Sequence, residues 1–216
     1  MSKLSLCYAC GENEADTMDH VPPKCFFPKN SGLKLMTVPC CTRCNFEFSK
    51  TDGELRAWFS LHYRASEVGK AIREEKVKSG TFLRNRKLAR KIEATIHYEI
   101  KPNTGGMIIL KQGIVEWEVM NPFLERCTKG ITRLACPQLN LSKAEFNVFE
   151  IAPHTTYDAE IEVLRNRCRK SRKAGCDVFS FQGNLDTETL SNGVLVMMFY
   201  RAAIFGVRWR LPDQSN

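Results

Sequence analysis

Cys7-Tyr8-Ala9-Cys10 and Cys41-Thr42-Arg43-Cys44-Asn45 frame the stretch of sequence that decides the fold of this chain. Within each pair, two residues stand between the cysteines. This spacing places two thiolates on one tight turn, where they can share a metal ion. Two such pairs complete the tetrahedral set of sulfur ligands that Zn²⁺ prefers in a closed structural site. We therefore predict structural zinc bound by Cys7, Cys10, Cys41 and Cys44.

Other cysteines leave an alternative open. Cys40 stands beside Cys41 and could replace it as a ligand, and Cys25 is also near in the sequence. The two-residue spacing favours Cys41. We interpret the cysteines without such pairing as buried or partly exposed thiols: Cys127, Cys136, Cys168 and Cys176.

The composition adds an excess of positive charge. The 216 residues include 32 Lys and Arg against 24 Asp and Glu, which gives a formal net charge of +8. A polyanionic partner, most simply nucleic acid, explains such an excess. No apolar stretch resembling a signal sequence precedes Cys7, and the apolar run over residues 194–207 is interrupted by Arg201 and too short to cross a bilayer. We expect a cytoplasmic protein without membrane contact, whose cysteines are metal ligands or thiols rather than disulfides.

Three parts follow one another along the chain, and together they predict an α+β protein. Residues 1–55 form the compact zinc-stapled module, rich in Pro and poor in regular periodicity. Residues 56–94 show helical spacing of apolar residues and many basic ones. Residues 95–216 mix alternating and helical patterns, which indicates a C-terminal α+β domain.

Basic residues are concentrated after the module. A helix predicted over residues 82–92 carries five of them, and two more stand within the module. Such side chains give salt-dependent, sequence-independent affinity for a phosphate backbone, although a charge run is also typical of a solvated helix face. We favour weak nucleic-acid contacts from Lys24, Lys50, Arg84, Arg86, Lys87, Arg90 and Lys91.

Between the cysteine pairs stands Met18-Asp19-His20-Val21-Pro22-Pro23-Lys24, and Asn45 directly follows the second pair. This order resembles the HNH, or ββα-metal, nuclease module in its zinc-containing four-cysteine form, as found in phage junction-resolving endonucleases. Together with Thr37-Val38-Pro39 and Ser49-Lys50-Thr51-Asp52, the stretch is similar to small bacterial and phage HNH endonucleases. The resemblance covers residues 7–52, about a quarter of the chain.

The resemblance implies hydrolysis of DNA phosphodiester bonds with one divalent ion and a histidine general base. That reaction needs an activated water and a cation that offsets charge on the phosphorane. Asp19 and Asn45 offer oxygen ligands suited to Mg²⁺ or Mn²⁺. His20, facing the other way from Asp19 on an extended strand, would take the proton from water. The predicted catalytic residues are thus His20, Asp19 and Asn45.

One departure from the family pattern concerns the loop before Thr37. The family usually carries an asparagine there that fastens the loop bearing the histidine, whereas this chain has Lys34, with Asn30 as a possible substitute. We interpret Asp52 as a helix-capping residue. A protein that binds nucleic acid through an inert zinc ribbon, without cutting it, is the alternative.

The residues after Thr95 match no family that we can name. Two roles fit them: recognition of a particular DNA structure or modification, or formation of a homodimer in which two modules cut two strands. A third and weaker interpretation of the whole chain is a zinc-stabilised interaction protein whose basic charge serves solubility or an acidic protein partner. Sequence does not separate these roles.

Overall fold

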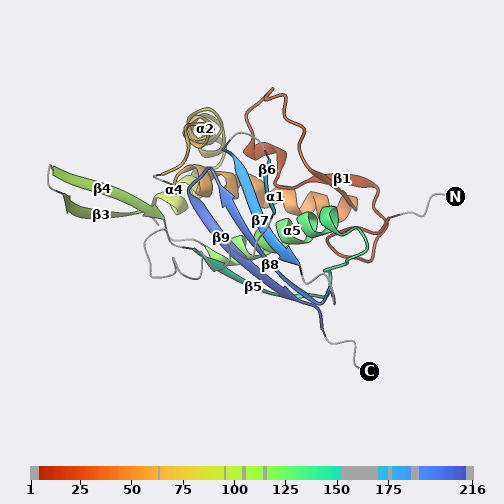
Figure 1. Cartoon of the computed structure of the whole chain (residues 1–216). Helices are drawn as coiled ribbons and strands as arrows, with labels where there is room; N and C mark the ends of the chain where they lie inside the picture. The colour runs from red at the N-terminus through yellow and green to blue at the C-terminus, as the bar shows by residue number, and fades with distance from the viewer. Residues whose placement is uncertain are drawn as a thin grey trace.

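The computed structural model describes residues 5–62, 64–94, 96–103, 106–113, 116–151, 170–174, 177–185 and 190–212. Helices alternate with short strands in the first half of the chain, and antiparallel strands dominate the second half. This arrangement confirms the predicted mixed α+β class (Figure 1).

The N-terminal region is a β-hairpin followed by a long helix. Strand β1 (Thr17–His20) pairs antiparallel with β2 (Thr37–Cys40), and the short helix η1 (Lys24–Phe26) lies in the connection. Helix α1 (Thr42–Ser60) starts directly after β2, with Cys41 as its N-cap residue. The β-branched Thr37 and Val38 favour the extended conformation of β2, which ends at Cys40, directly before the N-cap residue Cys41.

A run of short helical segments follows α1. They are α2 (Glu67–Ile72), the π-helical segment η2 (Arg73–Thr81), α3 (Phe82–Arg84) and α4 (Arg86–Ala94). The helix predicted over residues 82–92 is therefore broken. Asn85 leaves the helical conformation, and its side-chain oxygen accepts a hydrogen bond of 2.9 Å from the amide of Leu88, which caps α4.

Beyond α4, strands β3 (Ile96–Asn103) and β4 (Gly106–Gly113) form an antiparallel hairpin that projects from the body of the molecule (Figure 1). Helix α5 (Trp117–Ala135) then returns to the body.

A five-stranded antiparallel sheet forms the C-terminal part, in the order β5-β9-β8-β7-β6. Its strands are β5 (Glu145–Glu150), β6 (Lys170–Ala174), β7 (Phe179–Leu185), β8 (Asn192–Phe199) and β9 (Ala203–Arg210). Tyr200 and Arg201 make the turn between β8 and β9 with positive φ angles of 49° and 59°. Helix α5 crosses one face of this sheet (Figure 1), where it contacts β5 and β9.

The largest core joins all three predicted parts of the chain. Phe26 stacks on Phe123 of α5 with ring centroids 5.6 Å apart, and Phe59 of α1 stacks on Phe199 of β8 at 4.3 Å. The Tyr200 hydroxyl donates to the carbonyl of Phe26 at 2.8 Å. Helix α1 also continues through residue 55 to Ser60. The N-terminal module is thus packed on the sheet and α5. The division of the chain into three parts at residues 55 and 94 stays a prediction.

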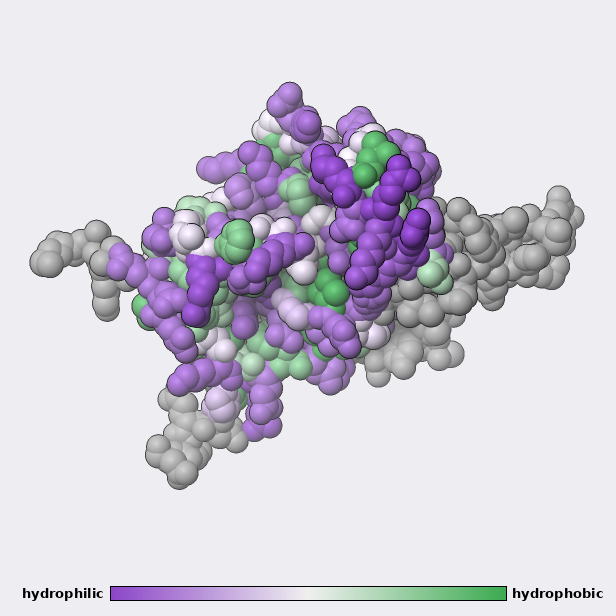
Figure 2. Space-filling view, turned by 180° about the vertical axis from the view of Figure 1, so that it is seen from behind, coloured by the Kyte–Doolittle hydropathy of each residue, from purple (hydrophilic) through white to green (hydrophobic). Residues whose placement is uncertain are grey.

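Hydrophilic residues dominate the face of the molecule seen in Figure 2, with apolar ones scattered among them. Among the helices of the described residues, none combines the length and the apolar character that a membrane crossing requires.

Candidate metal centre and its surroundings

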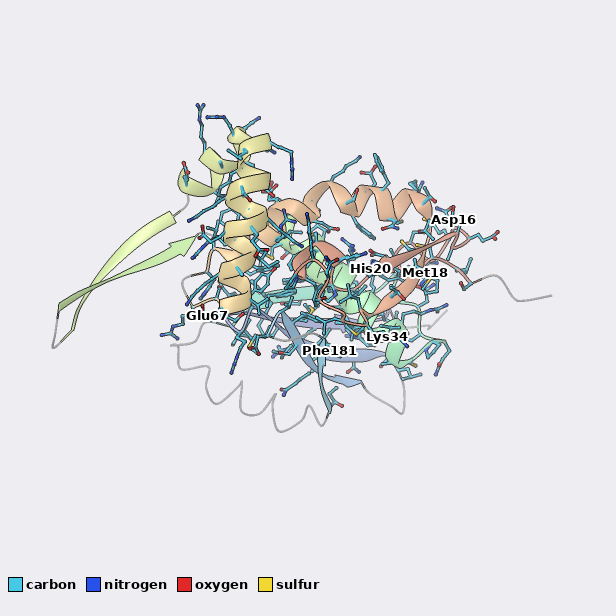
Figure 3. The ribbon with its side chains drawn as sticks, turned by 90° about the horizontal axis from the view of Figure 1, so that it is seen from above. Asp16, Met18, His20, Lys34, Glu67 and Phe181 are labelled. Carbon is cyan, nitrogen blue, oxygen red and sulfur yellow. The ribbon has the colours of Figure 1, made fainter. Side chains whose placement is uncertain are left out.

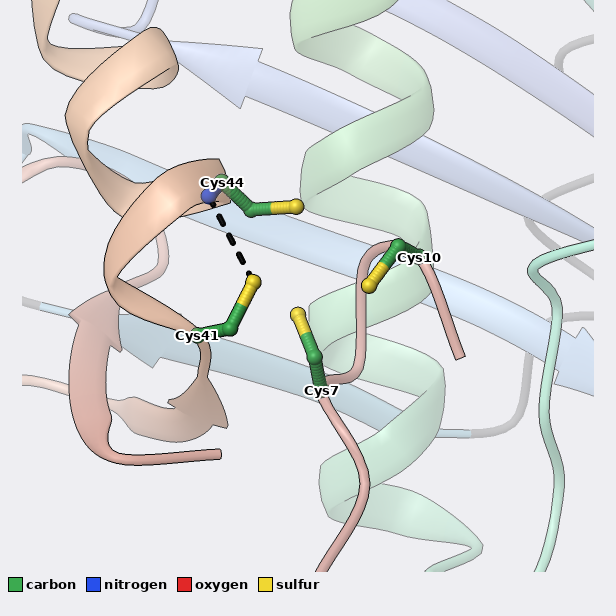
Figure 4. Close-up of side chains that lie close together, drawn as sticks. All are labelled: Cys7, Cys10, Cys41 and Cys44. Carbon is green, nitrogen blue, oxygen red and sulfur yellow. Dashed lines mark hydrogen bonds between the residues drawn. The ribbon is translucent and has the colours of Figure 1, made fainter. Parts of the chain in front are cut away.

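Four cysteine side chains converge between the N-terminal turn and the start of α1 (Figure 4). The sulfur atoms of Cys7, Cys10, Cys41 and Cys44 all lie within 4.8 Å of one another. A tetrahedral Zn²⁺ site with Zn–S bonds of about 2.3 Å has sulfur–sulfur edges of about 3.8 Å, so small adjustments close the cluster on an ion. The donor set and its geometry fit a closed structural zinc site.

Backbone turns place these sulfurs. The amide of Gly11 donates to the carbonyl of Cys7 at 2.9 Å and closes the first turn. Cys41 caps α1, and its sulfur accepts from the amide of Cys44 at 3.5 Å (Figure 4) and from the Asn13 side chain at 3.7 Å. The positive end of the α1 dipole and these N–H donors favour thiolates at the cluster.

Cys40 and Cys25, the two alternative ligands considered from the sequence, lie outside the cluster. Cys40 is fully buried, and its thiol lies 3.8 Å from the sulfur of Cys7. This hydrogen bond, with backbone amides, lowers the pKa of Cys7 to about 3, which favours the metal-binding thiolate, whereas burial and the neighbouring thiols raise the pKa of Cys44. The thiol of Cys25 points to the carbonyl of Asp52, and burial raises its pKa to about 11. The structure therefore selects Cys41, as the spacing predicted.

A lysine outside the N-terminal module faces the cluster. Burial lowers the pKa of Lys129 on α5, whereas Glu125 and the nearby thiols of Cys44, Cys10 and Cys7 raise it. A zinc ion with four thiolates carries a net charge of −2, which a neighbouring ammonium partly offsets. The ammonium of Lys129 also donates to the carbonyl of Ala9, between Cys7 and Cys10, at 3.5 Å, so Lys129 would link α5 to the cluster when it holds zinc. Nothing in the spacing of the cysteines pointed to this residue.

Asp19 occupies a different environment from the one that the sequence suggested. Its side chain is buried, and both carboxylate oxygens accept from Arg126 of α5, Oδ1 from Nη2 at 2.8 Å and Oδ2 from Nε at 3.0 Å. The hydroxyl of Tyr8 donates to Oδ2 at 2.5 Å. These are charge-assisted hydrogen bonds with bidentate geometry, the strong class of such interactions.

Arg126 links Asp19 to a second carboxylate. Its Nη1 lies 2.6 Å from Oδ1 of Asp52, and its guanidinium stacks 4.2 Å from the ring centre of Phe48. Burial raises the pKa of Asp52 and outweighs the lowering by Arg126. Burial lowers the pKa of Arg126, but the charges of Asp52 and Asp19 raise it by more, so its pKa is above the ordinary value. Asp52 lies inside α1, so the predicted capping role is wrong and its partner is Arg126.

A charged residue on an apolar helix face was the one available signal for this network. Arg126 stands among buried residues of α5 that include Phe123, Leu124 and Cys127. Charged residues are almost never fully buried unless they are paired. The sequence could thus have indicated a buried acidic partner for Arg126, but not which one.

His20 and Asn45 lie on either side of strand β1. His20 ends the strand half-buried, and strand alternation places its side chain on the face shared with Met18, opposite Asp19 (Figure 3). The side-chain amide of Asn45, in the first turn of α1, donates to Oγ1 of Thr17 at 3.3 Å and to the carbonyl of Met18 at 3.5 Å. The structure therefore ties Asn45 to β1, whereas Asp19 faces α5.

This arrangement tests the predicted Mg²⁺ or Mn²⁺ site. A divalent ion would meet the guanidinium of Arg126 at both oxygens of Asp19, and like charges in a buried environment repel strongly. Asp19 and Asn45, as arranged here, do not fit a divalent ion. Among the described residues, the four cysteines form the one group of three or more His, Cys, Asp or Glu that could hold a metal.

Two of the predicted nucleic-acid contacts are lysines that pair with acidic side chains, and the others are exposed lysines and arginines. Lys50 pairs with Glu47 at 2.7 Å, and Lys91 pairs with both Glu54 and Glu116. Lys34, in the loop before β2, is exposed. Side chains from η1, α3 and α4 are also exposed and extend the positive surface: Lys24, Arg84, Arg86, Lys87 and Arg90.

Comparison with protein-family models, with curated proteins and with solved structures gives no match to this chain.

Proposed function

We propose that this protein is an HNH-type nuclease that hydrolyses DNA phosphodiester bonds, with its N-terminal module held by structural zinc. The observation that carries the proposal is the four-cysteine cluster, which joins the turn before β1 to the first turn of α1. It joins a hairpin bearing Asp19-His20 to a helix whose first turn carries Cys44-Asn45, the order found in the sequence motif. The net charge of +8 suits a polyanionic substrate.

His20 is the residue of this chain that would move the proton. It is half-buried at the end of β1, and as a neutral imidazole it can take a proton from a water that attacks phosphorus. Asn45 donates to the carbonyl of Met18 and to the side-chain hydroxyl of Thr17, which fixes the strand that carries His20. The exposed lysines and arginines beside the module would bind neighbouring phosphates.

Binding without cleavage is the second candidate, and the Asp19–Arg126 pair favours it. When bound, a divalent ion offsets charge on the phosphorane and the departing oxygen. Asp19 is the carboxylate that the motif provides for that ion, and Arg126 and Tyr8 hold both of its oxygens. With this pair intact, the module is a zinc-stapled DNA-binding surface.

Cleavage of supercoiled plasmid separates the two candidates. Zinc-loaded wild type, His20→Ala and a matched control, Met18→Ala, are each incubated with Mg²⁺, with Mn²⁺ and with EDTA. Met18 is a suitable control because it lies on the same face of β1 and is 51% exposed. The nuclease proposal expects metal-dependent nicking that Met18→Ala keeps and His20→Ala loses. Because Arg126 holds both oxygens of Asp19, such cleavage would also require Asp19 to leave Arg126 when the ion binds.

Other outcomes are equally informative. Salt-sensitive DNA binding without cutting, on plasmid and on branched DNA alike, supports the binding module. If the folded, zinc-loaded protein neither cuts nor binds DNA, both candidates are rejected.

A further inference from the structure

A cavity of about 350 Å³ lies away from the zinc cluster, where the loop after η1 meets α1, η2 and α3. Four basic side chains and one acidic one contribute to its wall, so it carries a clear excess of positive charge. Its lining residues are Lys29, Arg56, Glu75, Lys76, Ser79, Gly80 and Arg84.

Arg56 of α1 is the buried residue of this wall. It is 8% exposed, and its Nη2 donates to Oγ1 of Thr81 at 2.5 Å and to the carbonyl of Lys76 at 3.4 Å. Within the described part of the chain, its Nε is buried and has no hydrogen-bond partner. Arg126, by contrast, is held by two carboxylates. A buried guanidinium whose acceptors are uncharged is costly, and an anion is the partner that would complete it.

Lys76 adds a second ordered cation. Its ammonium donates to the carbonyl of Phe27 at 2.5 Å and to that of Cys25 at 3.3 Å, which fixes it at the wall. Burial lowers the pKa of Lys76, and the neighbouring charges of Arg56 and Lys29 lower it further. Cys25 and Glu75 oppose this shift without reversing it. These cations therefore repel one another across the cavity, and a bound anion would relieve that repulsion.

Two exposed cations complete the wall. Lys29 and Arg84 are exposed, so their long side chains can close on a ligand that enters from solvent. Gly80 allows the guanidinium of Arg84 to approach the backbone, because a Cβ at Gly80 would lie 3.3 Å from Nη2 of Arg84. Paired guanidinium and ammonium groups match the several oxygens and the double charge of a phosphate better than a single carboxylate.

We propose that this cavity is a phosphate-binding site, which takes either a free phosphate or mononucleotide or the phosphorylated end of a nucleic-acid strand. Its volume lies in the range of small-molecule sites and exceeds what a lone phosphate fills, so the group attached to the phosphate fits as well. The site is independent of His20 and of the zinc cluster. Its failure and the failure of the nuclease proposal are therefore distinguishable.

Titration calorimetry of the full zinc-loaded chain at constant ionic strength tests the proposal. The probes are inorganic phosphate, a deoxynucleoside 5′-monophosphate, and one oligonucleotide with and without a 5′-phosphate. Arg84→Gln and Lys29→Gln remove exposed cations of the wall. Lys78→Gln is the matched control, because Lys78 is an exposed cation on η2 that does not line the cavity.

We expect saturable binding that weakens about tenfold in Arg84→Gln and Lys29→Gln, the effect of losing one charge-assisted hydrogen bond, and stays unchanged in Lys78→Gln. Preference for the 5′-phosphorylated oligonucleotide identifies a strand end as the ligand. Binding of phosphate or mononucleotide without that preference identifies a free phosphate. Absence of saturable binding, or equal weakening by Lys78→Gln, overturns the proposal.

Discussion

Replacing Arg126 by methionine removes the charge that holds two carboxylates while keeping much of the side-chain volume. Arg126 is 4% exposed and binds Asp19 at 2.8 Å and Asp52 at 2.6 Å. The side chain of Asp19 is 5% exposed and that of Asp52 is 15% exposed. Arg126→Met therefore leaves two carboxylates largely out of water without a counter-charge, and we expect a strong loss of stability.

The size of the loss follows from the proton that the variant can take up. An aspartate with an ordinary pKa of about 3.9 can be protonated at pH 7 at a cost of about 4 kcal/mol, because each pKa unit corresponds to about 1.36 kcal/mol. Proton uptake limits the penalty for one unpaired carboxylate to about this value. The value agrees with the roughly 3–5 kcal/mol measured when buried ion pairs are broken. At pH 5 the same cost is only about 1.5 kcal/mol.

The sign of the pH dependence follows from Asp52. Its pKa is already raised by burial, and removal of Arg126 takes away the opposing contribution. A group with a raised folded-state pKa contributes stability that is full below its unfolded pKa and is lost as pH rises through the folded pKa. The deficit of Arg126→Met relative to wild type should thus be about 4 kcal/mol at pH 7 and shrink by more than half at pH 5.

Urea unfolding of the zinc-loaded proteins at both pH values provides the measurement. Adding Asp19→Asn to Arg126→Met should recover part of the loss, because it removes one of the unpaired charges. A deficit below about 1 kcal/mol at pH 7, or one that does not depend on pH, would refute a buried and charged network at this position.

Three further predictions concern the zinc site, the hydrogen bond from the Tyr8 hydroxyl to Asp19, and the packing of α5. Cys10→Ser should reduce bound zinc from about one ion per chain, as measured by atomic emission, whereas Cys25→Ser should keep it. Tyr8→Phe removes the hydrogen bond to Asp19 and should cost about 1–3 kcal/mol in urea unfolding; no loss would argue against that contact. Gly130→Ala puts a Cβ 2.6 Å from Val21 and should cost about 1–3 kcal/mol, and a neutral result would mean that α5 moves freely.

Local features of the chain could be predicted because they depend on neighbouring residues. The two-residue spacing identified the zinc cluster and selected Cys41 over Cys40, since both members of a pair share one turn. Helix boundaries were less predictable, because Asn85 caps a new helix inside a run that has good helical composition. The α+β class followed from the change of apolar periodicity along the chain.

The sequence by itself therefore determined the four-cysteine cluster and the mixed α+β class, because spacing and periodicity are properties of short segments. Only the tertiary structure decided what surrounds Asp19. Its partner Arg126 lies 107 residues further along the chain, and the fold brings the two together by packing α5 on the N-terminal module. The cavity at Arg56 has the same origin, because its wall joins a loop, α1, η2 and α3. Long-range contacts of this kind depend on where whole elements pack, and no pattern within either segment specifies that position.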